Sequence, residues 1–236
     1  ETLILRDFSP DDIELNEFFL NQGLLKTSLP DTHTLSINNW PVSQQFPTGL
    51  DRKKRQYINH KVFNYLDYFH VNIEVSGKEK SKEWYDLYRN VNDKSHEINT
   101  FSLPLRLFEQ IADDPSWEVI ELRLKTKYDI TANHKIVAAM FARKDTTEYC
   151  PLFVGLDYEY LDLNIYPQIL WQTILRARNL KLEKVNLGFT ASQNKRKFGA
   201  TAFPQIGFVQ LKDNLNLALL ALIPNKSLLF VEKLSR

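Results

Sequence analysis

The chain has 236 residues, of which 43% are hydrophobic and 25% are charged, values that fit one large domain or a core domain with an extension. Its 30 Lys and Arg against 29 Asp and Glu leave a formal charge of +1, so no overall field draws it to nucleic acid or to an anionic membrane. The single cysteine, Cys150, excludes an intramolecular disulfide, and no apolar run is long enough to span a membrane. We therefore expect a cytoplasmic protein with no nucleic-acid partner and no membrane span.

Glycine is scarce in this chain, and its 7 positions exclude three glycine-based motifs. They form no G-x-G-x-x-G and no G-x-x-x-x-G-K, which excludes the usual dinucleotide and triphosphate cradles. No G-x-S-x-G is present, which excludes the usual nucleophilic serine of α/β-hydrolases. Because the chain opens on Glu1, we expect a segment to precede it in the native protein.

Residues 1–51 are expected to form an N-terminal extension packed on the core. Asp11 and Asp12 precede an apolar pattern that starts at Ile13 and predicts a short helix. From residue 30 to residue 47 the chain is rich in Pro, Asn, Ser, Thr and Gln. This composition predicts an ordered loop that is anchored by Trp40 and Phe46.

Helical spacing of apolar residues recurs in the next part of the chain. One helical face is predicted from Ile58 to Phe69, in a segment that begins at Arg52. An alternating strand follows over residues 71–75. Further helices are predicted over residues 81–91 and 104–113.

Apolar runs predict four strands in the second half of the chain. The segment Ile136–Ala142 is apolar on both faces, as in a central strand that is covered on two sides. The order of strands and helices predicts a three-layer α/β (α+β) domain, while Leu215–Ile223 fits a strand or a helix. The other predicted elements are strands at Trp117–Lys125, Leu152–Leu156 and Val185–Phe189, a helix that begins at Asn164, and a short basic helix from Ser192 to Gly199.

This order of elements resembles that of the GNAT acyltransferase superfamily. The segments "DRKKRQYINHKV", "WEVIELRL", "KIVAAMFA", "GLDYEYLDLNIYPQILWQTILRARNLKLEKVNLG" and "KRKFGA" are similar to those of the subfamily related to Fem-type peptidoglycan aminoacyltransferases. The resemblance covers residues 52–199 and is clearest from Trp117 to Ala200. It implies a mixed central sheet with helices on both faces over residues 52–236. It also implies an acyltransferase that moves an acyl group from an acyl-CoA-type thioester to an amine.

The resemblance further implies where the acyl donor binds. In a GNAT-like fold two neighbouring core strands separate, and the amide arm of the donor pairs with one of them. In this chain the two strands would be Leu152–Leu156 and Val185–Phe189, with the donor phosphates at the start of the following helix. The donor contacts expected from this arrangement are Leu156, Asn164, Ile165, Tyr166, Leu187 and Lys195.

Two features of the sequence depart from the superfamily pattern. Members that bind acetyl-CoA carry Q/R-x-x-G-x-G/A before the long helix, but residues 161–166 contain no glycine. No tyrosine occurs between Phe189 and Ala200, where the superfamily often places the residue that protonates the leaving thiolate. Lys195 could bind a phosphate or carboxylate there, or it could belong to a solvated basic helix face.

Asp157 and Tyr160 are the candidate catalytic residues. Asp157 follows the strand that would border the donor, and a carboxylate there can take a proton from the amine, directly or through water. The alternative is that Asp157 begins a turn and the neighbouring tyrosines pack on the helix below. On the acceptor side His96 and Asn99 are expected to contact the substrate, since the loop between the first two GNAT helices covers the acceptor pocket.

No metal site is expected, because the five histidines form neither H-x-H nor H-E-x-x-H and there is no cysteine pair. Cys150 is interpreted as a small buried apolar residue in preference to a catalytic thiolate.

Two other functions stay open besides acyl transfer between a small-molecule donor and an amine acceptor. A non-catalytic GNAT-like binding module of a larger enzyme or pathway is favoured by the two departures described above. An aminoacyl-tRNA-dependent Fem-like aminoacyltransferase is disfavoured by the charge of +1, because tRNA binding normally requires a broad basic surface. Binding of an acyl-CoA would separate the first function from the others.

Overall fold

The computed structural model describes residues 2–38, 40–74, 77–94, 102–128 and 134–211. Its contacts divide the chain into two compact units, Glu1–Thr32 with Ala202–Arg236, and His33–Thr201. The extension expected over residues 1–51 is therefore divided between these units. Leu215–Ile223 lies outside the described residues.

The second unit is built on a mixed β-sheet. Its strand order is β2 (Leu25–Ser36, of which the end belongs to this unit), β7 (Lys184–Asn186), β6 (Glu148–Leu156), β5 (Ile136–Lys144), β4 (Trp117–Leu124) and β3 (Phe69–Glu74). Neighbouring strands are antiparallel except β6 and β7, which are parallel.

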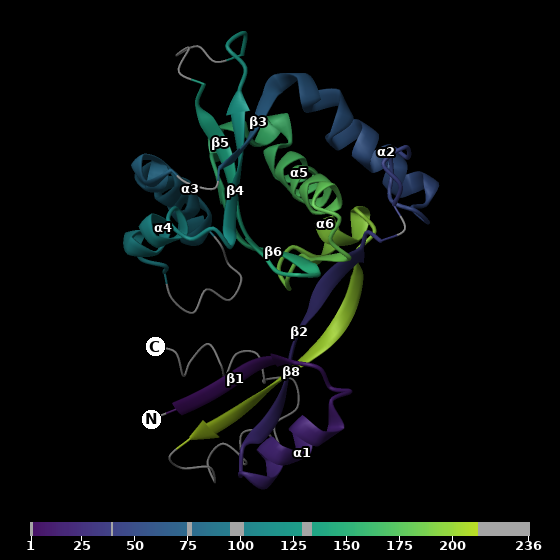
Figure 1. Cartoon of the computed structure of the whole chain (residues 1–236), viewed down its shortest axis with the longest axis vertical. Helices are drawn as coiled ribbons and strands as arrows, with labels where there is room; N and C mark the ends of the chain where they lie inside the picture. Colours follow the sequence, from purple (N-terminus) through teal and green to yellow (C-terminus); the bar gives the residue numbers. More distant parts are fainter. Residues whose placement is uncertain (1, 39, 75–76, 95–101, 129–133, 212–236) are drawn as a thin grey trace. The chain divides into compact units, whose positions relative to one another are not determined.

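Helices cover both faces of this sheet (Figure 1). One face carries α3 (Ser81–Lys94) and α4 (Leu105–Ile111), and the other carries α2 (Arg52–Lys61) and α5 (Ile165–Asn179). These three layers confirm the predicted α/β (α+β) class and its GNAT-like mixed sheet with helices on both faces. The remaining helical segments of the unit are α6 (Ser192–Lys197) and the short 3-10 helices η1 (Phe63–Tyr68), η2 (Lys78–Lys80) and η3 (Tyr158–Leu163).

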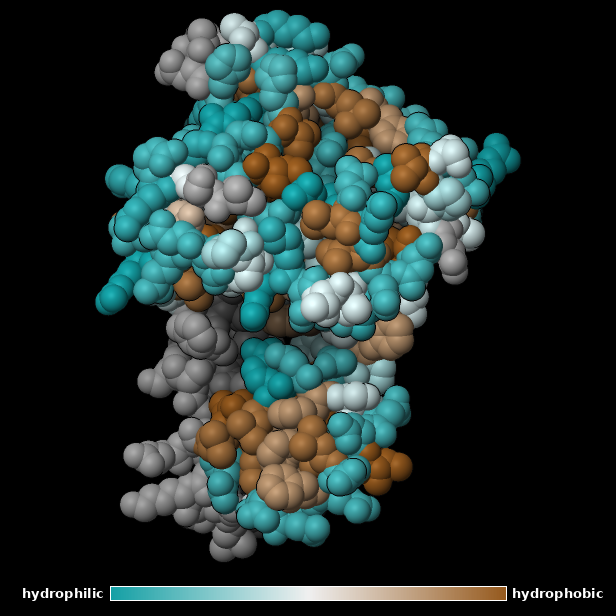
Figure 2. Space-filling view, viewed as in Figure 1, coloured by the Kyte–Doolittle hydropathy of each residue, from teal (hydrophilic) through white to brown (hydrophobic). Residues whose placement is uncertain are grey.

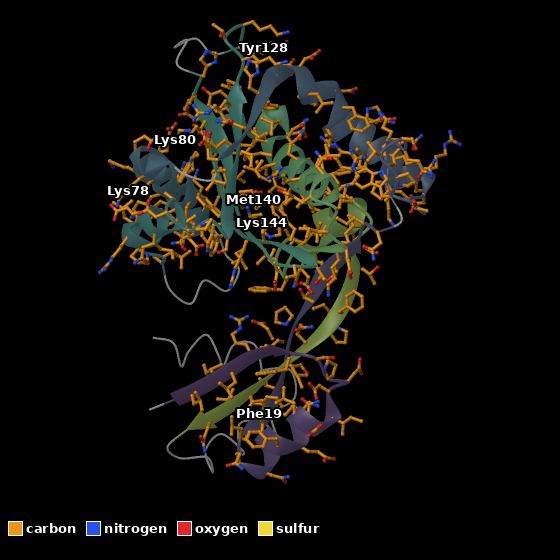
Figure 3. The ribbon with its side chains drawn as sticks, in the orientation of Figure 1. Phe19, Lys78, Lys80, Tyr128, Met140 and Lys144 are labelled. Carbon is orange, nitrogen blue, oxygen red and sulfur yellow. The ribbon has the colours of Figure 1, made fainter. Side chains whose placement is uncertain are left out.

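The strand β5 forms the centre of the sheet. Every residue from Ile136 to Ala142 is buried, and Phe141 and Met140 face opposite helical layers. Met140 lies inside this unit (Figure 3). The prediction of a central strand covered on both faces is confirmed.

Two glutamates of β4 are buried, and both are matched by cations. Glu118 accepts hydrogen bonds from Arg176 at 2.6 and 2.9 Å, and Lys144 Nζ lies 3.0 Å from its Oε1. Glu121 accepts hydrogen bonds from Trp84 Nε1 at 2.7 Å and from Arg123 Nε at 2.9 Å. These bonds tie β4 to helices on both faces, because Arg176 belongs to α5 and Trp84 to α3.

The first unit contains β1 (Thr2–Phe8), α1 (Ile13–Asn21), the first part of β2, and β8 (Thr201–Leu211) from Ala202 onward. β1 pairs antiparallel with β8, and α1 begins where the side chain of Asp12 accepts a hydrogen bond from the Leu15 amide. Its small core contains the rings of Phe8, Phe19 and Phe208, with 4.8 Å between the centroids of the last two. Large apolar side chains also remain exposed on this unit, among them Leu3, Ile13, Phe18 and Phe203 (Figure 2).

Several predicted boundaries are wrong. The loop predicted from residue 30 begins as strand β2, although Trp40 is buried as expected. The helical face predicted to reach Phe69 ends at Lys61, because the chain continues as the 3-10 helix η1 and then as β3. β7 ends at Asn186 instead of Phe189, since the chain turns at Gly188, whose φ of 71° is in the left-handed region.

Candidate functional site

The edge between β6 and β7 opens along its length. The two strands pair at Glu148 with Lys184 and at Tyr149 with Val185, and within the described residues their pairing stops there. β6 continues to Leu156, still paired with β5 on its other side. The main chain of β6 from Cys150 to Leu156 is therefore not paired with β7, as predicted for the two core strands.

Asp157 follows directly on this open edge. Its amide donates to the carbonyl of Val137 at 2.9 Å, which fixes it to the start of β5. Its Oδ1 accepts the amide of Glu159 at 3.1 Å, so Asp157 also caps η3, as the alternative turn interpretation predicted. The side chain is 13% exposed, so solvent still reaches the carboxylate.

Lys135 joins the two candidate catalytic residues. Its Nζ lies 2.7 Å from Oδ2 of Asp157 and 4.8 Å from the ring centroid of Tyr160. The hydrogen bond to Asp157 raises the pKa of the Lys135 ammonium, which stays charged at neutral pH. Asp157 and Tyr160 are thus brought together, through a lysine that the sequence analysis did not single out.

A cavity of about 470 Å³ borders Asp157 on the α3 face of the sheet. Carboxylates outnumber lysines four to two among its lining side chains. The charge of Lys82 is balanced by Asp86, 3.6 Å away, and the charge of Lys135 is balanced by Asp157. The carboxylates of Glu79 and Glu83 then give the cavity a net negative charge. The lining residues are Glu79, Lys82, Glu83, Asp86, Leu87, Asn90, Lys135, Ile136 and Asp157.

Close packing of α3 on β6 shapes this cavity. A Cβ on Gly155 would lie 2.7 Å from the Leu87 Cβ and 2.7 Å from the Tyr88 amide nitrogen, so only glycine permits the contact. One turn later the Asn90 side chain donates to the carbonyl of Leu156 at 3.2 Å. Leu156 itself is buried, so it contributes main chain to the site and its side chain to the core.

The helix α5, which comes after η3, begins at the predicted anion site. Asn164 has a φ of 55° and precedes α5 without a side-chain cap, and the first turn of α5 holds no acidic residue. The amides of such a first turn have no partner within their own helix. Ile165 is fully buried, so it can offer a ligand only its main chain, and Tyr166 follows it in the first turn of α5. No glycine forms a phosphate cradle here.

The two donor contacts predicted near β7 are Leu187 and Lys195, and the structure places them in different surroundings. Leu187 donates its amide to the carbonyl of His33 at 2.8 Å, so only its carbonyl can meet a donor. Lys195 is only 3% exposed, and its Nζ lies 4.0 Å from the position of a Cβ on Gly188. The alternative of a solvated helix face is wrong for Lys195, although Arg196 and Lys197 are exposed.

The remaining predicted residues do not add to this site. His96 and Asn99 lie outside the described residues. Cys150 is half-buried, and burial, together with nearby Glu148, raises the pKa of its thiol to about 11, which opposes a thiolate. The described part of the chain holds no group of three or more metal-ligating side chains. Over the same residues no helix has the length and apolar character to span a bilayer.

The comparisons with known proteins agree with this geometry. A family model described as an acetyltransferase (GNAT) domain matches residues 52–196, which is more than half of the chain. No curated protein matches the chain. Many solved structures are also similar to the chain, at low sequence identity.

One similar structure, from Agrobacterium fabrum, is described as the C-terminal domain of a lysylphosphatidylglycerol synthetase. It has a TM-score of 0.62 and 13% sequence identity, and the match covers 92% of this chain and 70% of that one. FemX has a TM-score of 0.63 and 12% sequence identity, and the match covers 92% of this chain and 74% of FemX. A tandem GNAT protein from the clavulanic acid biosynthesis pathway has a TM-score of 0.51 and 7% sequence identity. That match covers 89% of this chain and 63% of the tandem protein. The expected resemblance to GNAT proteins with Fem-like relatives is confirmed, and the chain belongs to the acetyltransferase (GNAT) domain family.

Proposed function

We propose that the protein is an N-acyltransferase that moves an acyl group from a CoA-type thioester to a cationic amine. The observation that carries this proposal is the position of Asp157, between the open edge of β6 and the acidic cavity. Membership of the GNAT family supports acyl transfer in general. The donor and the acceptor follow from the chemistry of the two sides of Asp157.

On the donor side, the part of β6 that does not pair with β7 suits the amide arm of a pantetheine group, which would add like an extra strand. The start of α5 would receive the phosphates, and the buried ammonium of Lys195 adds positive charge on the β7 side. The missing glycine cradle makes a weaker pyrophosphate site than a tight phosphate loop would. We therefore expect donor affinity to depend on the arm more than on the phosphates.

On the acceptor side, the negative cavity favours a substrate with a positive charge. An ammonium group that enters it meets Asp157, which already binds the Lys135 ammonium at 2.7 Å. Lys135 shows that a protonated amine fits beside this carboxylate. Asp157 takes a proton from the incoming ammonium, and the free amine attacks the acyl carbon. The C–N bond forms, the C–S bond breaks, and the second proton that the nitrogen loses passes to the leaving thiolate.

Donor binding and transfer test the proposal separately. The chain is mixed with a panel of acyl-CoA esters, and thermal unfolding is followed; a ligand at 100 times its Kd stabilises the fold by about 2.7 kcal/mol. Release of free CoA thiol is then measured with a diamine, with an amino acid and with a diol of matched length. We expect a thermal shift with at least one ester, and thiol release with the diamine but not with the diol. Absence of both from the whole panel would exclude the CoA donor.

A further inference from the structure

Asn90 lines the acidic cavity and is also bonded to the main chain of β6. Its Nδ2 donates to the carbonyl oxygen of Leu156 at 3.2 Å, although the two residues are 66 positions apart in the sequence. Leu156 is the last residue of β6, and Asp157 comes directly after it. A side chain of the proposed acceptor cavity therefore reaches the strand that is proposed to bind the donor.

The register of β5 and β6 fixes the direction of this carbonyl. Leu156 lies opposite Ala138, and the amide of Asp157 donates to the carbonyl of Val137. In an antiparallel pair of strands, residues that exchange hydrogen bonds alternate with residues that do not, so the main-chain groups of Leu156 point away from β5. β7 is the neighbour of β6 on that side, but within the described residues its pairing with β6 stops earlier in the strand. The amide group of Asn90 thus lies at the open edge of β6.

Main-chain packing holds Asn90 at this edge. A Cβ on Gly155 would lie 2.7 Å from the Cβ of Leu87, so α3 contacts β6 directly at that point. Leu87 and Asn90 are three residues apart on α3, and side chains at this spacing lie on the same face of a helix. The contact between α3 and Gly155 therefore brings Asn90 to the next residue of the strand, Leu156. The position of the amide depends on the packing of two backbones.

The bond to Leu156 also fixes which way the amide of Asn90 faces. A carbonyl oxygen can only accept hydrogen bonds, so the NH2 group faces Leu156 and Oδ1 faces away from it. Within the part of the chain that the structure describes, no donor is bonded to Oδ1. Asn90 is exposed and lines the cavity, so a ligand there can reach this oxygen. The cavity therefore offers a ligand a fixed neutral acceptor beside the carboxylate of Asp157.

An amine has the hydrogen atoms that these two acceptors require. A primary ammonium group carries three N–H donors, and two of them remain after Asp157 has taken a proton. One of these two can bond to Oδ1 of Asn90 while the lone pair of the nitrogen faces the acyl carbon. A hydroxyl group has a single hydrogen, which the base must remove, so it has none to donate to Asn90. A site built to bond an N–H group discriminates strongly against an analogue that lacks it.

We propose that Asn90 holds the reacting nitrogen of the acceptor and selects amines over alcohols, an inference that rests on the proposed acyltransferase function. Its Nδ2 stays on the carbonyl of Leu156, and its Oδ1 accepts an N–H of the amine. The nitrogen is then held between Asp157 and the strand that binds the donor. In the transfer the C–N bond forms, the C–S bond breaks, and the two protons pass to Asp157 and to the thiolate. Asn90 neither gains nor loses a proton.

Binding in the absence of donor tests this contact without any reaction. The full chain is titrated by calorimetry with the diamine and with its quaternary analogue, in which methyl groups replace every N–H and the charge is kept. We expect the diamine to bind more tightly. Asn90→Ala is expected to weaken the diamine by about 10-fold or more and to leave the analogue unchanged, so the preference narrows. Asn179→Ala is the matched control, because it removes the same side chain from the exposed end of α5, and it is expected to keep the full preference.

A purely structural role for Asn90 gives a different result. If Asn90 only tied α3 to β6, Asn90→Ala would weaken the diamine and its quaternary analogue alike, and this outcome would overturn the inference. The melting temperature of the variant shows whether the fold is kept. We expect it to stay close to that of the unmodified chain, because Asn90 is exposed and alanine favours a helix.

Turnover distinguishes failure of this inference from failure of the proposed function. With an acyl-CoA ester that the unmodified chain uses, Asn90→Ala is expected to lower kcat/KM for the diamine by about 10- to 100-fold. An unchanged kcat/KM together with an unchanged preference for the diamine would overturn the inference and leave the acyltransferase standing. Absence of diamine binding and of thiol release in the unmodified chain would overturn both.

Discussion

Lys135 Nζ and Asp157 Oδ2 lie 2.7 Å apart, and both residues line the acidic cavity. The lysine precedes β5 and the aspartate follows β6, so the contact depends on the antiparallel register of the two strands. An amine that enters the cavity must share the carboxylate with Lys135. The site is therefore already arranged around one ammonium group before a substrate arrives.

Replacement of Asp157 separates chemistry from binding. Asp157→Asn removes the proton acceptor and keeps the shape, so we expect turnover to fall by roughly 100-fold or more while the donor-induced thermal shift is unchanged. Asp86→Asn is the matched control, because it removes another carboxylate of the same cavity. It is expected to raise KM for the amine with little effect on kcat. Equal effects of the two changes on kcat would remove Asp157 from the role of base.

The central part of the fold could be predicted from the sequence, because burial on two faces leaves a direct mark. The segment Ile136–Ala142 contains only apolar residues, and all of them are buried. β2 left no such mark, because its residues Leu25–Ser36 include polar side chains and Pro30. A strand of this composition is recognised only through the partners that it pairs with, which the sequence does not show.

The candidate site was predictable only where it depends on the end of one strand. Asp157 was found because it follows an apolar run, and Lys135 could have been found by pairing the start of β5 with the end of β6. The hydrogen bond between His33 and Ser192, outside this site, could not be predicted either, since it requires strand β2, which the sequence did not indicate. The basic run around Lys195 is typical of a surface helix, so the sequence does not indicate that this side chain is buried in the folded structure.

Met140 tests the central strand. Met140→Asp would place a carboxylate without a partner in the middle of the sheet, where Met140 is 4% exposed. Burial of an unpaired charge costs more than the whole stability of many domains of this size, so we expect the variant to be unfolded by circular dichroism. Met140→Leu keeps the volume and is expected to cost less than about 1.5 kcal/mol. A folded Met140→Asp with an unchanged melting temperature would contradict the central placement.

Gly155 tests the close packing of α3 on β6. In Gly155→Ala the added Cβ would lie 2.7 Å from the main chain of Tyr88, so the helix must move away from the strand. We expect a loss of about 1–3 kcal/mol in the free energy of unfolding, measured by urea titration. Because α3 lines the cavity, we also expect the KM for the acceptor amine to rise. Leu152→Ala on the same strand is the control, since Leu152 is 57% exposed, and it is expected to change stability little. If Gly155→Ala were as stable as the control, α3 would not be held against β6 as described.

The ion pairs of Glu118 predict how stability changes in acid. Burial raises the pKa of the Glu118 carboxyl, but hydrogen bonds from Arg176 and Lys144 outweigh burial and hold the pKa below its ordinary value of 4.5. A carboxyl with a lowered pKa in the folded state stabilises the fold above its ordinary pKa, and this contribution is lost as the pH falls through the folded-state value. We therefore expect the free energy of unfolding to decrease below about pH 4.5, partly through this group.

Glu118→Gln isolates this contribution. The change leaves Arg176 and Lys144 without their carboxylate, and we expect a loss of about 3 kcal/mol at neutral pH, as for breaking a buried ion pair. Because protonation of Glu118 removes the same charge from the unmodified chain, the difference between the two proteins should narrow as the pH falls toward 3. Glu148→Gln is the control, since its partner Lys184 is 42% exposed and such pairs contribute at most about 1 kcal/mol. Urea titrations at several pH values measure both differences, and a Glu118→Gln deficit that stayed constant from pH 7 to pH 3 would contradict the assigned charge state.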